Sequence, residues 1–276
     1  MIHRVLKIAL EAGREVMEVY RETFSVEYKE DRTPLTEADR RSHRVITEGL
    51  RKLDPSIPIL SEEGKETPYE ERKSWRSFWL VDPLDGTKEF VKRNGEFTVN
   101  VALIEGNLPV LGVVFAPALE LLYFARRGEG AYRLKTDGGI LSEEKAERLP
   151  LKREGDSPET LRVVASRSHR NRETEEFVSR LRTKVKEIEL VSIGSSLKMC
   201  LVAEGRADIY PRLGPTMEWD TAAGHAIALE SGCEVKLYNG KLSNTLTYNK
   251  RNLLNPPFVV FRKEKAYLFE RGVLEI

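Results

Sequence analysis

The chain has 276 residues, of which 40% are hydrophobic and 32% are charged, a composition typical of globular proteins and unlike that of disordered chains. Its 45 Lys and Arg residues are balanced by 44 Asp and Glu residues, which argues against a global field that would attract nucleic acid or an anionic membrane. An anionic substrate must therefore be bound by a local arrangement of side chains.

Three features of the sequence predict the compartment and the source of the protein. Cys200 and Cys233 are far apart in apolar helical surroundings, which favours two buried, reduced thiols over a disulfide. The apolar stretch at residues 5–10 is too short and too quickly followed by charge to be a signal peptide or a membrane span, so we expect a cytoplasmic protein. The chain contains no glutamine and is dense in charges of both signs, which predicts a thermophilic source.

The first half of the chain predicts two helices followed by antiparallel strands. Apolar residues recur at helical spacing over residues 3–22 and predict a first helix there. A second helix is expected at 36–53, and its first four residues are Thr-Glu-Ala-Asp. The polar residues 26–34 between them predict a loop or hairpin. Strands are then expected at 78–81, 97–105, 110–115 and 121–125. This pattern predicts an antiparallel meander packed on the two helices.

The second half alternates between strands and helices. Strands are expected at 162–165, 187–191, 207–210 and 233–236, with helices at 173–182, 195–204 and 218–231. Such alternation predicts an α/β layer whose strands lie between helices. A polar segment at 137–158 marks a boundary, so we expect an N-terminal α+β domain over residues 1–158 and a C-terminal α/β domain over residues 159–276.

The most informative motif is an apolar run, Trp79 to Val81, that ends in Asp82-Pro-Leu-Asp85-Gly-Thr. Because Pro83 cannot continue a ladder, we expect the strand to end before it and to leave both carboxylates together at its carboxyl edge. Uncompensated like charges would repel one another there. Mg²⁺ takes oxygen ligands and commonly bridges carboxylates to a substrate phosphate, so the motif predicts a magnesium site.

Two other acidic residues, Glu62 and Asp220, lie at the ends of expected elements beside small or turn-forming residues. Each has an ordinary alternative: Glu62 as a solvated loop acid, and Asp220 as a helix N-terminal acid that complements the helix dipole. His225 lies on an apolar helix face, where a core imidazole is expected more often than a metal ligand.

Two short segments could bind an anion. If a helix or turn begins at Gly86 and Thr87, their backbone N–H groups and the hydroxyl face a phosphate; the alternative is a simple helix cap. Gly194, Ser195 and Ser196, which precede Leu197 to Glu204 of the next expected helix, carry the same two alternatives.

Together these motifs resemble those of the inositol monophosphatase-like, lithium-sensitive, magnesium-dependent phosphatases. Within that superfamily the chain is most similar to the bacterial 3′(2′),5′-bisphosphate nucleotidases. The resemblance implies a layered α/β/α/β/α sugar-phosphatase fold, in agreement with the expected order of elements. The segments that carry the resemblance follow the family's order over most of the chain: 60–63, 79–90, 92–100, 166–169, 192–198 and 219–225.

The resemblance also implies site residues. Magnesium ligands are implied at Glu62, Asp82, Asp85, Asp220 and the main-chain carbonyl of Leu84. Catalytic roles are implied for Thr87 and Glu62, and for Asp39, which would accept a hydrogen bond from the Thr87 hydroxyl. Contacts to the substrate are implied for Glu62, Leu84, Asp85, Gly86, Thr87, Asp220, Gly194 and Ser195.

The expected reaction is hydrolysis of the 3′-phosphate of adenosine 3′,5′-bisphosphate to AMP, and of 3′-phosphoadenylyl sulfate, a step of nucleotide metabolism in sulfur assimilation. Two or three Mg²⁺ ions per site and inhibition by Li⁺ are implied by the resemblance. We expect the partner to be a small phosphoester and not a nucleic acid, and the enzyme to be a monomer or homodimer.

The substrate is less well determined than the chemistry. Lys88 follows Thr87 at a position where inositol phosphatases usually carry a neutral residue, and Lys198, Arg167 and His169 could contact the 5′-phosphate of the nucleotide. The alternative is inositol monophosphatase or fructose-1,6-bisphosphatase activity, the same chemistry on a sugar. A non-catalytic metal-binding protein of the same fold would have lost a ligand, and all the acidic positions are retained.

Overall fold

The computed structural model describes residues 1–28, 34–138, 141–151, 160–166, 172–183 and 185–270. Its helices are α1 (Ile2–Arg21), α2 (Glu37–Leu53), α3 (Tyr69–Arg72), α4 (Thr87–Val91), α5 (Arg172–Arg182), α6 (Leu197–Glu204), α7 (Glu218–Glu230) and α8 (Tyr267–Glu270), with 3₁₀ turns η1 (Pro117–Leu119), η2 (Glu143–Lys145) and η3 (Lys263–Lys265). Its strands are β1 (Glu27–Tyr28), β2 (Pro34–Leu35), β3 (Ile59–Ser61), β4 (Ser77–Asp85), β5 (Thr98–Glu105), β6 (Leu108–Ala116), β7 (Leu121–Arg126), β8 (Gly130–Lys135), β9 (Glu147–Arg148), β10 (Thr160–Ser166), β11 (Glu187–Ile193), β12 (Ile209–Arg212), β13 (Cys233–Tyr238), β14 (Leu242–Thr245) and β15 (Phe258–Arg262).

The first sheet has seven strands in the order β3-β4-β5-β6-β7-β8-β9. Neighbouring strands are antiparallel except β3 and β4, which are parallel. The predicted meander is confirmed, and β3, β8 and β9 extend it beyond the four strands that were expected. The segment between the first two helices forms the small β1–β2 hairpin, one of the two predicted alternatives.

Strand β4 corrects one expectation, because it does not end before Pro83. It continues to Asp85, with Asp82 opposite Asn100 and Asp85 opposite Thr98, so that β4 carries one more residue than β5 between these pairs. The extra residue is a β-bulge, which accommodates a proline inside a strand and turns neighbouring groups away from the regular ladder. The Ser42 hydroxyl of α2 donates a hydrogen bond of 2.7 Å to the Pro83 carbonyl and fixes the bulge against the helix.

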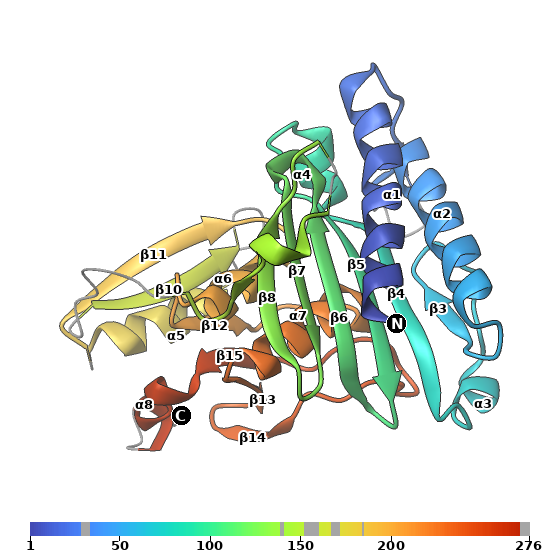
Figure 1. The fold of residues 1–276 in the computed structure, drawn as a ribbon. Helices are drawn as coiled ribbons and strands as arrows, with labels where there is room; N and C mark the ends of the chain where they lie inside the picture. Colours follow the sequence, from blue (N-terminus) through green and yellow to red (C-terminus); the bar gives the residue numbers. More distant parts are fainter. Residues whose placement is uncertain (29–33, 139–140, 152–159, 167–171, 184, 271–276) are drawn as a thin grey trace.

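The elements form five layers, helix, sheet, helix, sheet and helix, as the resemblance implied (Figure 1). Alternate side chains of β4 face opposite sides of the first sheet: Trp79 packs with α1 and α2, whereas Leu80 packs with α6 and α7. The inner face of the second sheet contributes Val260 to the same core as α6 and α7, and its outer face packs Val163 against Phe177 of α5.

The second sheet has the strand order β11-β10-β12-β15-β13-β14. Strands β10 to β12 are parallel, as alternation with helices predicts, but β15 lies between β12 and β13 and is antiparallel to both. Strand β15, and strand β14 beside β13, are not among the strands that the sequence predicts. Strands β14 and β15, within residues 241–262, therefore complete the second sheet.

The two halves of the chain share one core. Helix α7 packs directly on the first sheet, where a Cβ atom added to Gly112 of β6 would lie 2.3 Å from the carbonyl oxygen of Ala223. The predicted boundary near residue 158 falls outside the described residues and stays a prediction. Cys200 and Cys233 are buried and free, which confirms the expectation for the thiols. None of the described helices is long and apolar enough to cross a bilayer.

Candidate active site

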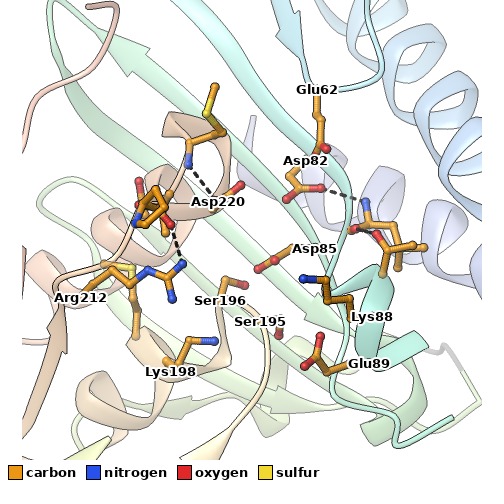
Figure 2. Close-up of a pocket in the computed structure, with 18 of the residues that line it drawn as sticks. Glu62, Asp82, Asp85, Lys88, Glu89, Ser195, Ser196, Lys198, Arg212 and Asp220 are labelled. Carbon is orange, nitrogen blue, oxygen red and sulfur yellow. Dashed lines mark hydrogen bonds between the residues drawn. The ribbon is translucent and has the colours of Figure 1, made fainter. Parts of the chain in front are cut away.

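Four acidic residues from three separate segments meet between the first sheet and α7. Glu62 follows β3, Asp82 and Asp85 lie on β4, and Asp220 lies in the first turn of α7. Carboxylate oxygens of Glu62, Asp82 and Asp220 are all within 4.8 Å of one another. Figure 2 shows Asp85 directed toward the same space. The structure therefore brings together the four acidic residues that the sequence predicted.

Backbone hydrogen bonds fix three of these residues, Glu62, Asp82 and Asp220. The Glu62 N–H donates to the Val81 carbonyl (3.1 Å), because β3 runs parallel to β4. In the bulge, the Leu84 N–H donates to Asp82 Oδ1 (3.1 Å). At the start of α7, the Met217 N–H donates to Asp220 Oδ2 (2.9 Å).

The environment of this cluster disfavours charge on its carboxylates. Burial raises the pKa of Asp82 well above its usual value, and the charges of Glu62, Asp85 and Asp220 raise it further. Burial, followed by Asp85 and Glu62, raises the pKa of Asp220 to about 8. Burial also raises the pKa of Asp85 to about 6, although Lys198 and the Ser196 N–H lower it.

These residues fit a hard divalent cation. The donor set consists of oxygen atoms, which Mg²⁺ prefers, and a cation between the carboxylates would remove the repulsion that burial makes costly. The cluster therefore has the chemistry of a metal centre.

A cavity of about 420 Å³ opens over the carboxylates. Across it from Glu62 and Asp82 lie two cations, Lys198 on α6 and Arg212 at the end of β12 (Figure 2). Burial lowers the pKa of Lys198 to about 8, and Arg212 donates to the Pro215 carbonyl (2.6 Å). One wall of the cavity is thus acidic and the opposite wall is basic.

Sequence reasoning missed Arg212 and the buried Glu89, which also lines this cavity. Arg212 carried the same local signal as Asp82 and Asp85, a charged residue at the end of an apolar strand that contains a proline. Glu89 had no such signal, because it lies in a polar stretch within the short helix α4.

The loops before α4 and α6 meet beside the cluster. Gly86 adopts φ 87° and Ser195 adopts φ 50°, and a Cβ atom on Gly86 would lie 3.2 Å from the Ser195 Cβ. Helix α4 begins at Thr87, whose hydroxyl donates to the Leu84 carbonyl (3.2 Å). Seven of the predicted substrate-contacting residues line the cavity: Glu62, Leu84, Asp85, Gly86, Thr87, Ser195 and Asp220.

Asp39 and Gly194 are absent from the described lining of the cavity. Asp39 Oδ2 accepts hydrogen bonds from the Thr36 N–H (2.7 Å) and hydroxyl (2.8 Å), which forms a capping box at the start of α2. Burial raises the pKa of Asp39 to about 7. The Gly194 N–H donates to Glu96 Oε2 (2.8 Å). The catalytic role of Asp39 and the substrate contact of Gly194 stay predictions.

Other candidates lie at the edge of the site or away from it. Lys88 is exposed at the cavity, whereas Arg167 and His169 lie outside the described residues. His225 is buried in α7, where its Nδ1 is 2.9 Å from the Tyr248 hydroxyl, and burial lowers its pKa to about 3. His225 is therefore a core imidazole, as the helix pattern predicted.

Comparison with known proteins agrees with this architecture. The model of the inositol monophosphatase family matches residues 2–270. The 3′(2′),5′-bisphosphate nucleotidase CysQ of Salmonella typhimurium is 49% identical over 265 residues, which cover 94% of this chain and 99% of that protein. The crystal structure of CysQ from Bacteroides thetaiotaomicron superposes with a TM-score of 0.84 at 46% identity, covering 95% of this chain and 97% of that one. An IMPase of Thermotoga maritima gives a TM-score of 0.75 at 27% identity, with 97% and 94% covered.

Proposed function

The chain belongs to the inositol monophosphatase family, and on that premise we propose that it removes the 3′-phosphate of adenosine 3′,5′-bisphosphate, giving AMP and phosphate. One observation carries the proposal: a single cavity has the carboxylates of Glu62, Asp82, Asp85 and Asp220 on one wall and the cations Lys198 and Arg212 on the other. A substrate with two phosphates separated by a nucleoside can place one phosphate at the acidic wall, bound through a divalent cation, and the other beside Lys198 and Arg212. The CysQ name of the relatives from Salmonella and Bacteroides supports the same substrate.

Mg²⁺ is the cation that we propose for the acidic wall, with two or three ions per site and inhibition by Li⁺. Its proposed ligands are Glu62, Asp82, Asp85, Asp220 and the Leu84 carbonyl. When bound, magnesium would neutralise charge on the phosphoryl oxygens and make water a better nucleophile at neutral pH.

The residues of the chain then orient the reaction. The Thr87 hydroxyl and the Glu62 carboxylate face the cavity, where they would hold the attacking water, with Glu62 accepting a proton from it. Gly86 and Thr87 lie at the turn into α4 and would contact the scissile phosphate. Displacement in line needs no covalent phosphoenzyme, because water attacks the phosphorus directly.

Lys198 and Arg212 determine the substrate in this proposal. Asp85 favours the charged form of the buried Lys198 and the neighbouring Arg212 disfavours it. An anion bound by both cations would gain charge-assisted hydrogen bonds and would offset the effect of Arg212 on Lys198. The 5′-phosphate of adenosine 3′,5′-bisphosphate supplies this anion, and so does the 5′-phosphosulfate of 3′-phosphoadenylyl sulfate, which we propose as a second substrate. Inositol monophosphate has no second phosphate to place there.

The test compares phosphate release from adenosine 3′,5′-bisphosphate, adenosine 3′-monophosphate, inositol 1-phosphate and fructose 1,6-bisphosphate, with Mg²⁺ and with or without Li⁺. We expect the highest kcat/KM for adenosine 3′,5′-bisphosphate. Lys198→Met should raise KM for this substrate by about 10- to 100-fold, the value of a charge-assisted hydrogen bond, and change KM for the 3′-monophosphate little.

The matched control is Lys145→Met, because Lys145 is exposed and does not line the cavity. This variant should keep both KM values. Equal kcat/KM for the four compounds, or an equal rise of KM for both adenosine nucleotides in Lys198→Met, would contradict the proposed substrate.

A further inference from the structure

Residues 247–255, here called the strap, cross the start of α7 next to Asp220. The carboxylate of Glu218 is fully buried and bonds to the strap. Its Oε2 accepts the Asn249 N–H (2.7 Å), and its Oε1 accepts the Lys250 N–H (2.9 Å) and the Lys250 ammonium (2.6 Å). One buried carboxylate therefore holds two consecutive backbone amides and a lysine of the strap.

A buried arginine holds the same strap from the other side. Arg72 is 3% exposed, and it belongs to α3, in the segment that follows Glu62. Its guanidinium donates to the carbonyls of Lys250 (2.7 Å) and Arg251 (3.0 Å) and to Asn249 Oδ1 (2.9 Å). The Asn249 amide donates back to the Arg72 carbonyl (2.7 Å). The N–H groups of Asn249 and Lys250 thus bond to Glu218, and the carbonyls of Lys250 and Arg251 bond to Arg72.

The far end of the strap holds the backbone beside Asp220. Asn255 Nδ2 donates to the Met217 carbonyl (2.9 Å), and the Glu218 N–H donates to the Leu253 carbonyl (2.9 Å). Met217 in turn donates its own N–H to the Asp220 carboxylate (2.9 Å). The direction of that carboxylate therefore depends on a backbone segment that the strap holds in place.

Stability alone does not account for this network. A buried ion pair seldom stabilises a fold more than well-packed apolar side chains do, because desolvation offsets the attraction. Glu218 is absent from the described lining of the cavity, so contact with substrate does not account for it either. Its bonds instead connect the segment that carries Glu62, through Arg72, with the turn that carries Asp220.

We propose that Glu218 is a positioning residue for the metal centre: through the strap it fixes the carboxylate of Asp220 relative to that of Glu62. The inference rests on the proposed function, in which Asp220 and Glu62 are metal ligands. Partners that orient metal ligands typically change metal affinity by about 10- to 100-fold when they are removed.

The experiment measures Mn²⁺ binding to the full chain by isothermal titration calorimetry, without substrate. Glu218→Gln keeps the size of the side chain but presents an amide N–H to donors of the strap. We expect its Mn²⁺ affinity to fall by about 10-fold or more. In kinetic assays, the Mg²⁺ concentration for half-maximal activity should rise, whereas KM for the nucleotide at saturating Mg²⁺ should stay unchanged.

Glu204→Gln is the matched control. Glu204 is also fully buried, and it accepts hydrogen bonds from the Tyr123 hydroxyl (2.8 Å) and Arg133 Nη1 (3.0 Å) away from the cavity. Both substitutions should lower the thermal midpoint, but Glu204→Gln should retain wild-type Mn²⁺ affinity. Asn255→Ala, which frees the Met217 carbonyl, is a milder second variant that decides the question if Glu218→Gln does not fold; it should also weaken Mn²⁺ binding.

Two outcomes would overturn the inference, and they are distinguishable. If the wild-type chain binds no Mn²⁺, or if its binding is unchanged in Asp220→Asn, both the proposed function and this inference fail. If Asp220→Asn abolishes wild-type binding while the folded Glu218→Gln and Asn255→Ala variants bind Mn²⁺ like the wild type, this inference alone fails.

Discussion

Asp82 is 1% exposed and lies close to Glu62 and Asp220, so its negative charge opposes folding unless a cation is present. Within the part of the chain that the structure describes, the Leu84 N–H donates a backbone hydrogen bond to its carboxylate. Such an arrangement sacrifices stability at one residue to hold a binding site ready, as is common at functional sites.

We predict opposite effects of Asp82→Asn on activity and on stability. Asparagine keeps an oxygen for the Leu84 N–H but removes one charge from the cluster, so the metal-free variant should melt a few degrees higher than the metal-free wild type, at about 2–4 °C per kcal/mol. Its turnover should fall by about 10²- to 10⁴-fold, because a ligand that stabilises transition-state charge is lost. Thermal unfolding in EDTA and phosphate release in Mg²⁺ measure the two effects; near-normal turnover would contradict the metal assignment.

Individual residues differ in how far the sequence predicts them. Asp82, Asp85 and Asp220 could be predicted because the first two follow an apolar run, the third begins a helix, and all three lie beside turn-forming residues. Glu218 could not, because its partners are backbone amides of the strap, some thirty residues later, and no local pattern reveals them.

Helices and strands also differ in how far the sequence predicts them. The two N-terminal helices and the strands β5 to β7 carry strong periodic patterns, and the structure confirms them. Strand β4 runs further than expected because a bulge accommodates Pro83, and a bulge depends on pairing with β5 rather than on local preference. Strand β15 has four apolar residues followed by Arg262, and its place in the second sheet depends on its pairing with β12 and β13.

Helix α7 combines a functional first turn with a buried body that contains His225. The pKa of this imidazole is lowered to about 3 by burial, from an ordinary value of 6.5, so the folded chain keeps it neutral where the unfolded chain binds a proton. Its contribution to stability is therefore complete above pH 6.5 and is lost as the pH falls toward 3, at about 1.4 kcal/mol per pH unit.

We predict that His225→Gln reduces the sensitivity of the fold to acid. Urea unfolding in EDTA at pH 7.5 and at pH 5.0 measures the loss of unfolding free energy for each protein. The loss should be about 2 kcal/mol greater for the wild type than for the variant, since only the wild type takes up this proton on unfolding. Equal losses would show that the imidazole is already charged in the folded chain.

At the scale of the whole molecule, the composition predicts high thermal stability, and the structure contains ion-pair networks consistent with it. Arg41 of α2 lies within 4 Å of Glu15 and Glu18 of α1 and of Glu37 on its own helix. We expect a melting midpoint above about 65 °C, the upper end of the mesophilic range, measured by calorimetry. Because salt screens such surface networks, 1 M NaCl should lower it. A midpoint within the mesophilic range would contradict a thermophilic source.

The active site depends on the distance between the first sheet and α7, because Asp82 and Asp85 lie on the sheet and Asp220 lies on the helix. Gly112 of β6 sets that distance: a Cβ atom there would be 2.3 Å from the Ala223 carbonyl oxygen and 2.8 Å from the Ala226 Cβ. Neither atom belongs to a flexible side chain, so the whole helix must move to accept a methyl group. The short contact therefore connects core packing with the geometry of the metal centre.

We predict that Gly112→Ala lowers both the stability and the turnover of the enzyme. Overpacking should destabilise the fold by about 1–3 kcal/mol, and displacement of Asp220 by about 1 Å should reduce kcat by about 10²-fold. Gly49→Ala is the control, since the three heavy atoms nearest to its Cβ would all belong to the flexible Ile8 side chain of α1, the first at 2.7 Å, on the far side of the first sheet. In urea unfolding and saturating-substrate assays, the control should lose stability while kcat stays within about twofold of wild type. An unchanged kcat in Gly112→Ala would mean that the cluster tolerates movement of α7, and that the layers do not set its geometry.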